Sequence, residues 1–150
     1  MNERTVFEEA DHLGRRRARV LPFLAIIYLS QQGTFFASAP ADPTRLVDYV
    51  KVGAWVVLSL VLLAVLTTKG FWLRSREVRD LIDDEATRAN RVDALGWGFI
   101  MAILSAIVLF VLSIIAPTSA REAIHVIVSL GIAAAIVRFG MLERRAYRDA

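Results

Sequence analysis

The chain has 150 residues, a hydrophobic content of 56% and a mean hydropathy of +0.50, which is too apolar for an ordinary soluble domain. It contains no cysteine, so disulfides, thiolate metal sites and cysteine nucleophiles are excluded. The isoelectric point near 9.8 reflects basic residues at the ends of apolar segments. Membrane orientation explains that pattern, and we expect no nucleic-acid partner.

Four apolar segments are each long enough to cross a hydrocarbon core of about 30 Å, which takes roughly 20 residues. They are residues 20–39, 46–68, 94–116 and 122–142. Together they occupy more than half of the chain and leave no room for a soluble domain of any size. The sequence therefore predicts an all-α integral membrane protein with one domain, residues 1–150, and the lipid bilayer as a partner.

The first apolar segment superficially resembles a secretory signal, because Ala37, Ser38 and Ala39 imitate a cleavage site. The region before it is long and partly acidic, and Gln31 and Gln32 interrupt the apolar run. These features favour a retained helix. A short linker with two prolines, residues 40–45, leads into the second segment.

The segment from Lys69 to Asp93 separates two pairs of apolar segments and holds 12 of the 33 charged residues. Over residues 75–90, apolar side chains recur at steps of three and four, with charged side chains on the other face. This predicts an amphipathic helix that either lies on the membrane or extends the third span. Its charged face is the candidate partner surface, formed by Arg76, Arg79, Asp80, Asp83, Asp84, Arg88 and Arg91.

Orientation follows from the distribution of Lys and Arg near the ends of the spans. The N-terminal segment, the central insert and the C-terminal part contain fifteen of these residues, and the other two connections contain only Arg45, Lys51 and Arg121. The bias places both termini and the insert in the cytoplasm of a bacterial cell. The predicted architecture is a four-helix bundle in the inner membrane, N-in and C-in, with two short outer turns.

Polar residues recur in the outer half of three spans. On each helix they share one stripe, and the three stripes reach similar depths. If they face inward, they form a polar pocket open to the periplasm; otherwise they form hydrogen bonds between helices that fix the packing. The candidate pocket residues are Tyr28, Gln31, Gln32, Lys51, Trp55, Ser59, His125 and Ser129.

His125 is the only histidine within a span, which argues against a bis-histidine haem site. With Glu122 it makes an incomplete metal site, and we interpret the two as a polar pair at a helix start. Small residues at four-residue spacing, such as Gly98 and Ala102, predict close helix packing within the bundle or along a homodimer seam. No nucleotide, metalloprotease or hydrolase motif is present, and we expect no cofactor and no catalytic residue.

These features favour a non-enzymatic protein that acts through interaction, as an accessory, scaffold or regulatory subunit with a membrane-protein partner or as a homo-oligomer. The central insert would be the contact surface, because charge and amphipathicity concentrate there. The alternative is an oligomeric small-solute carrier or channel that uses the polar pocket. That alternative requires Gln31, Gln32 and His125, with Ser59, to face a common cavity.

Overall fold

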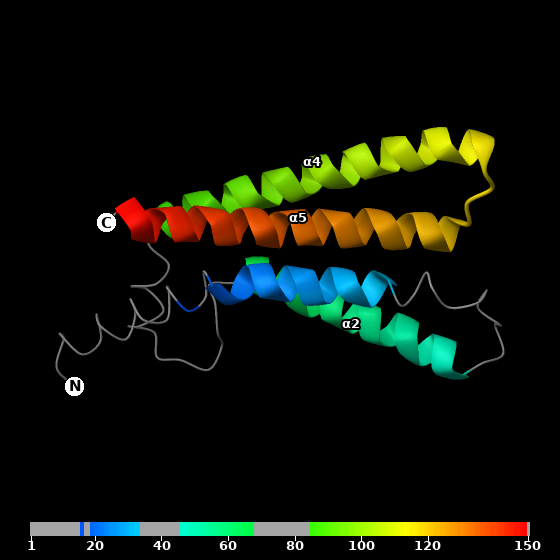
Figure 1. Cartoon of the computed structure of the whole chain (residues 1–150), viewed down its shortest axis with the longest axis horizontal. Helices are drawn as coiled ribbons and strands as arrows, with labels where there is room; N and C mark the ends of the chain where they lie inside the picture. Colours follow the sequence, from blue (N-terminus) through cyan, green and yellow to red (C-terminus); the bar gives the residue numbers. More distant parts are fainter. Residues whose placement is uncertain (1–15, 17–18, 34–45, 68–84, 150) are drawn as a thin grey trace.

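The computed structural model of the chain describes residue 16 and residues 19–33, 46–67 and 85–149. These residues form four helices and no strand, in agreement with the predicted all-α class. The helices are residues 19–33, α2 (Leu46–Thr67), α4 (Glu85–Ile115) and α5 (Ala120–Asp149). Successive helices run in alternating directions along the long axis of the molecule (Figure 1).

Three of the described helices are long and apolar enough to cross a membrane, as expected of a multi-pass membrane protein. The candidate spans are Tyr49–Thr67, Glu85–Ile115 and Ala120–Ala146. Large apolar side chains point outward from α4; Phe99, Phe110 and Ile114 are exposed by 67%, 71% and 74%. A continuous surface of this kind is unfavourable in water, whereas hydrocarbon solvates it.

The second, third and fourth predicted spans agree in position with the three candidate spans and differ in their ends. The helix of residues 19–33 covers the first part of the predicted span 20–39, and residues 34–39 lie outside the described residues. Helix α2 matches the predicted span 46–68 to within one residue.

Helix α4 begins at Glu85 rather than at Ala94, and α5 continues to Asp149 rather than ending at Leu142. Hydropathy detects the apolar part of a helix, but the backbone hydrogen bonds of the helix continue wherever the next residues are good helix formers. Ala, Arg and Glu, which dominate both extensions, are among the best. Residues 85–90 of the predicted amphipathic helix are thus continuous with α4, and residues 75–84 lie outside the described residues.

A short connection joins α4 to α5, and we call this end of the hairpin the turn end. Pro117 follows the last helical turn of α4, where its missing N–H costs no helical hydrogen bond. The Ser119 Oγ accepts a hydrogen bond from the Glu122 backbone N–H at 3.3 Å, and the Glu122 carboxylate accepts one from the Ser119 N–H at 3.0 Å. This reciprocal capping box fixes the start of α5.

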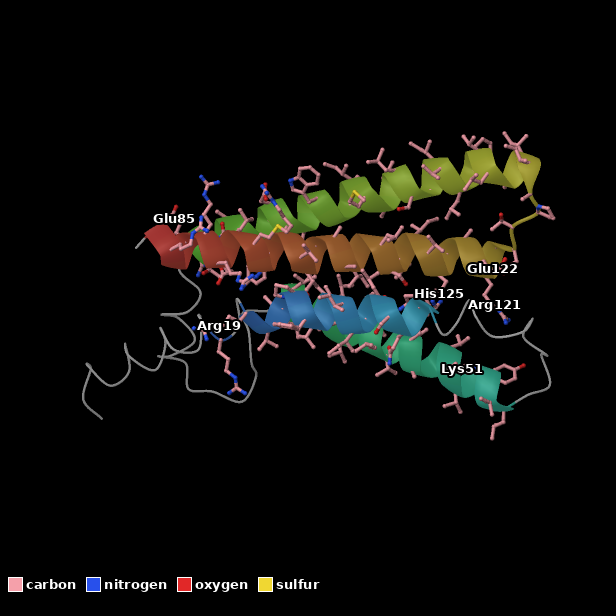
Figure 2. The ribbon with its side chains drawn as sticks, in the orientation of Figure 1. Arg19, Lys51, Glu85, Arg121, Glu122 and His125 are labelled. Carbon is pink, nitrogen blue, oxygen red and sulfur yellow. The ribbon has the colours of Figure 1, made fainter. Side chains whose placement is uncertain are left out.

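The opposite end of the hairpin, where α4 begins and α5 ends, carries most of its basic side chains, and we call it the basic end. Exposed arginines there are Arg88, Arg144, Arg145 and Arg148. At the turn end only Arg121 is basic among the described residues of α4 and α5. Figure 2 shows Glu85 and Arg121 at opposite ends of the molecule.

Small residues bring α4 and α5 into close contact. A Cβ atom built on Gly98 would lie 2.7 Å from the Gly131 carbonyl oxygen and 2.8 Å from the Ala135 Cβ. A Cβ on Gly131 would lie 3.1 Å from the Ala102 Cβ. The small-residue ladders thus meet each other within one chain, and the absence of side-chain bulk lets the two backbones approach.

The other two helices pack against α5, which therefore lies at the centre of the arrangement. Its Ile136 and Phe139 are 1% and 2% exposed. A Cβ on Gly140 would lie 3.1 Å from the Pro22 Cδ, so the start of the helix 19–33 lies directly on α5. The buried apolar core is formed by Leu21, Ala25, Tyr28, Leu62, Leu66, Ala94, Ala133, Ala135, Ile136 and Phe139.

Candidate functional site

A set of polar side chains, all buried except the half-buried Trp55, joins three helices in the half of the molecule near the turn end. We call this set the polar cluster. His125, only 3% exposed, extends from α5 toward the helix of residues 19–33 (Figure 2). Its Nε2–H donates a hydrogen bond to the Gln32 side-chain carbonyl. The members of the cluster are Tyr28, Gln32, Trp55, Ser59, His125 and Ser129.

Gln32 is held on both sides of its amide group. Its Nε2 donates to the Tyr28 backbone carbonyl at 2.9 Å, one helical turn earlier, while its Oε1 accepts from His125. These contacts orient the amide, and they place the imidazole in the tautomer that carries its proton on Nε2. A polar side chain on the helix 19–33 thereby fixes the ring of a residue on α5.

Trp55 links α2 to α5 in two ways. Its indole ring stacks on the imidazole of His125, with 4.4 Å between ring centroids and 24° between ring planes. Its Nε1–H donates to the Ser129 Oγ at 3.2 Å. Because His125 and Ser129 are one turn apart on α5, the flat indole covers both residues at once.

Tyr28 and Ser59 complete the cluster by joining the helix 19–33 to α2. Their hydroxyl groups share a hydrogen bond of 2.8 Å, and the Tyr28 ring is 1% exposed. Each hydroxyl group of this buried pair has the other as its hydrogen-bond partner. The cluster contains hydroxyl, amide and imidazole groups, so its chemistry is hydrogen bonding to neutral polar groups.

The structure places the eight predicted pocket residues in two groups. Six lie in the polar cluster and contact one another across three helices. The remaining two, Gln31 and Lys51, are exposed. Glu122 and His125, which the sequence suggested as a polar pair at a helix start, have separate roles: Glu122 caps α5 through Ser119, and His125 binds Gln32.

A second polar contact joins α4 to α5 at the basic end. Glu143 of α5 is only 2% exposed, and its Oε1 accepts a hydrogen bond from the Asn90 Nδ2 at 3.4 Å. Thr87, one turn before Arg91 on α4, is also buried. Because a buried polar group needs a hydrogen-bond partner, this contact joins α4 to α5 at the basic end.

A surface triad of Asp93, Trp97 and Arg138 lies beside this contact, where the apolar run of α4 begins. The Arg138 Nε donates to the Asp93 Oδ2 at 2.7 Å. The Arg138 guanidinium carbon lies 5.5 Å from the centre of the Trp97 ring, within the range of a cation–π contact. All three side chains are partly exposed.

The predicted partner surface is described only in part. Arg88 is exposed and Arg91 is half-buried on the first turns of α4. The other predicted members lie outside the described residues: Arg76, Arg79, Asp80, Asp83 and Asp84. Within the described ranges, no three acidic or histidine side chains lie close enough to hold a metal ion.

Sequence reasoning missed the capping box, the Asn90–Glu143 contact and the surface triad. The pattern Ser-x-x-Glu at Ser119 is a recognised start signal for a helix and would have predicted the first of these. The other two join residues far apart in the chain, for which one sequence carries no signal. Comparison of the chain with protein-family models, with curated proteins and with solved structures found no match.

Proposed function

We propose that the chain is a small bacterial inner-membrane protein of non-enzymatic type, which acts through protein contact as an accessory, scaffold or regulatory subunit. The observation that carries this proposal is the length of α4 and α5, which have 31 and 30 residues. At 1.5 Å per residue each is about 45 Å long, whereas a hydrocarbon core is about 30 Å thick. The excess length projects from the membrane as a pair of charged helices.

The proposed topology is a four-helix bundle with both termini in the cytoplasm. Arg88 and Arg144 lie on the projecting part of the hairpin, and Arg19 is the first residue of the helix 19–33. Cytoplasmic ends of spans carry an excess of Lys and Arg. The turn end, where Arg121 is the single basic residue of the described hairpin, would then face the periplasm.

The projecting helices have the properties of a preorganised contact surface. The Asn90–Glu143 hydrogen bond joins α4 to α5 at the base of the projection. A surface held in one arrangement loses less conformational entropy when a partner binds. Exposed arginines on such a surface are suited to acidic groups of a soluble or membrane partner, because a guanidinium forms paired hydrogen bonds with a carboxylate.

The test is purification of the tagged chain from its native membrane in a mild detergent, with identification of each co-purifying protein by mass spectrometry. The double variant Arg88→Ala/Arg144→Ala removes two exposed charges from the basic end. If each arginine contributes about 1 kcal/mol to the contact, recovery of the partner falls by roughly tenfold or more.

The matched control is Arg121→Ala, which removes an exposed arginine from the other end of α5 and should leave recovery unchanged. Equal recovery with the double variant and the wild type would contradict the proposal. So would an equal loss with Arg121→Ala, because the effect would then not belong to the basic end.

A second candidate function is an oligomeric small-solute carrier or channel that uses the polar cluster. It is favoured by the gathering of neutral polar groups from three helices near the turn end. Because the chain has no cysteine, Ser59→Cys and Ser129→Cys can each be probed with a membrane-impermeant thiol reagent. Labelling at a rate near that of the exposed control Arg121→Cys would favour this candidate, and protection of both positions would favour a purely structural cluster.

A further inference from the structure

The surface triad of Asp93, Trp97 and Arg138 places opposite charges and an indole side by side on the outside of the hairpin. The carboxylate and the guanidinium are 44% and 38% exposed, and Trp97 is 46% exposed. An ion pair with this exposure contributes little to stability, because water screens both charges. Joining α4 to α5 is therefore a weak explanation for the ion pair, since the close contact of Gly98 with Gly131 already brings the two helices together.

The triad retains unused hydrogen-bonding capacity. Arg138 binds Asp93 through Nε alone, and in the described part of the chain its two Nη amino groups have no hydrogen-bond partner. The Trp97 indole N–H likewise has none among the described residues. The site therefore offers donors from Arg138 and Trp97 and an acceptor from Asp93 within one small area.

The depth of the triad matches the headgroup layer of a membrane. Asp93 immediately precedes the apolar run that starts at Ala94, and Trp97 lies one turn further along α4. Tryptophan is enriched at this depth, because its ring prefers the interface and its N–H can reach polar lipid groups. Arg138 reaches the same layer from α5 by extending its side chain toward the surface.

An exposed apolar stripe continues from the triad into the membrane. Ile100 and Leu104 follow Trp97 by three and seven residues on α4, and each is 49% exposed. That spacing keeps them on the face of the helix that carries Trp97. A polar site at headgroup depth above an apolar stripe has the chemical layout of a phospholipid, with its headgroup at the triad and an acyl chain along α4.

We propose that Asp93, Trp97 and Arg138 bind the headgroup of a zwitterionic phospholipid with a primary ammonium group, as in phosphatidylethanolamine. The Arg138 amino groups donate to the phosphate, and the Asp93 carboxylate accepts from the ammonium. The triad has no net charge, so it complements a headgroup that has none. An anionic headgroup is repelled by Asp93, and the quaternary ammonium of phosphatidylcholine has no N–H to donate.

The test is lipid competition on the full chain in mixed micelles. The chain is incubated with equal amounts of phosphatidylethanolamine, phosphatidylcholine and phosphatidylglycerol of identical acyl chains, and native mass spectrometry measures which lipids remain bound. For an exposed charge pair, one headgroup contact corresponds to about a fivefold preference. The wild type should therefore retain phosphatidylethanolamine about fivefold over each of the other two lipids.

Two variants assign that preference to the triad. Asp93→Asn keeps the size of the side chain and removes the charge, so preference over phosphatidylcholine should disappear and retention of phosphatidylglycerol should rise. Arg138→Gln should lower retention of all three lipids. The control Arg121→Gln, at the other end of α5, should behave as the wild type.

Preference of the wild type for phosphatidylglycerol would overturn the proposal, because it would indicate a general attraction of basic residues for anionic lipid. Equal retention of all three lipids would overturn it as well. The wild-type competition requires no substitution, so these outcomes are readable even if a variant fails to fold. A preference that survives both Asp93→Asn and Arg138→Gln would place the lipid elsewhere on the chain.

Discussion

Gly98 of α4 faces Gly131 of α5 so closely that a Cβ on Gly98 would lie 2.7 Å from the Gly131 carbonyl oxygen. A contact this short with backbone atoms leaves no room for a methyl group. Gly96, two residues away on the same helix, has open space where its Cβ would be. The two glycines thus separate the effect of crowding from the effect of glycine on helix propensity.

We expect Gly98→Ala to lower the free energy of unfolding of the hairpin by about 1–3 kcal/mol, the usual cost of overpacking. Gly96→Ala should be neutral or stabilise the helix by up to about 1 kcal/mol, because alanine is the better helix former. Unfolding of each variant in mixed micelles, followed by circular dichroism, measures both values. Equal stability of the two variants would show that the close approach of α4 and α5 is not required.

The Tyr28–Ser59 hydrogen bond should couple the helix 19–33 to α2. Tyr28→Phe and Ser59→Ala each remove one hydroxyl, and the double variant removes the pair. Hydrogen bonds between membrane helices contribute about 0.6 kcal/mol on average, and the double-mutant cycle should give a coupling energy of that size. Strictly additive effects would mean that the two hydroxyls do not stabilise the packing of these helices.

The capping box at the start of α5 makes a separate prediction. Ser119→Ala removes the N-cap side chain and should destabilise the hairpin by about 1 kcal/mol. Ser113→Ala is the matched control, because the exposed Ser113 hydroxyl bonds only to the Phe110 carbonyl of its own helix. Thermal unfolding of the two variants in the same detergent is the measurement. A larger effect from Ser113→Ala would contradict the assignment of Ser119 as the cap.

The proposed orientation can be measured with single cysteines, since the natural chain has none. A membrane-impermeant thiol reagent should label Arg121→Cys in spheroplasts. It should label Arg148→Cys only in inverted membrane vesicles. The reverse pattern would place the termini outside. Labelling of both variants in both preparations would indicate two orientations in one membrane.

Much of the helical architecture could be predicted because hydropathy and helix length are local properties of the chain. The second span was placed to within one residue at α2, and the small-residue spacing of Gly98 and Ala102 indicated close packing. Hydropathy alone places the start of the third span at Ala94, although α4 also contains residues 85–93, because a charged stretch of helix has no hydropathy signal.

The candidate site was predictable only as a set of side chains. The helical spacing of polar residues indicated that Gln32, Trp55 and His125 could face one another, since helical periodicity fixes the direction of each side chain. They could not indicate that the amide of Gln32 would bind the imidazole or that the indole would stack on it. Those contacts depend on the rotation of three helices about their axes, which is set by packing across the whole core.

The Asp93–Arg138 pair also marks one end of the uncharged stretch of α4. From the residue after Asp93 to the end of α4 at Ile115, the helix runs without a charge for 22 residues, or about 33 Å at 1.5 Å per residue. The chain therefore matches a bilayer of ordinary thickness with only a modest tilt. In a thinner bilayer α4 and α5 would have to tilt together, because the close contact of Gly98 with Gly131 and Ala135 joins the two helices. Lipid chain length would then act directly on the angle at which the basic end leaves the membrane.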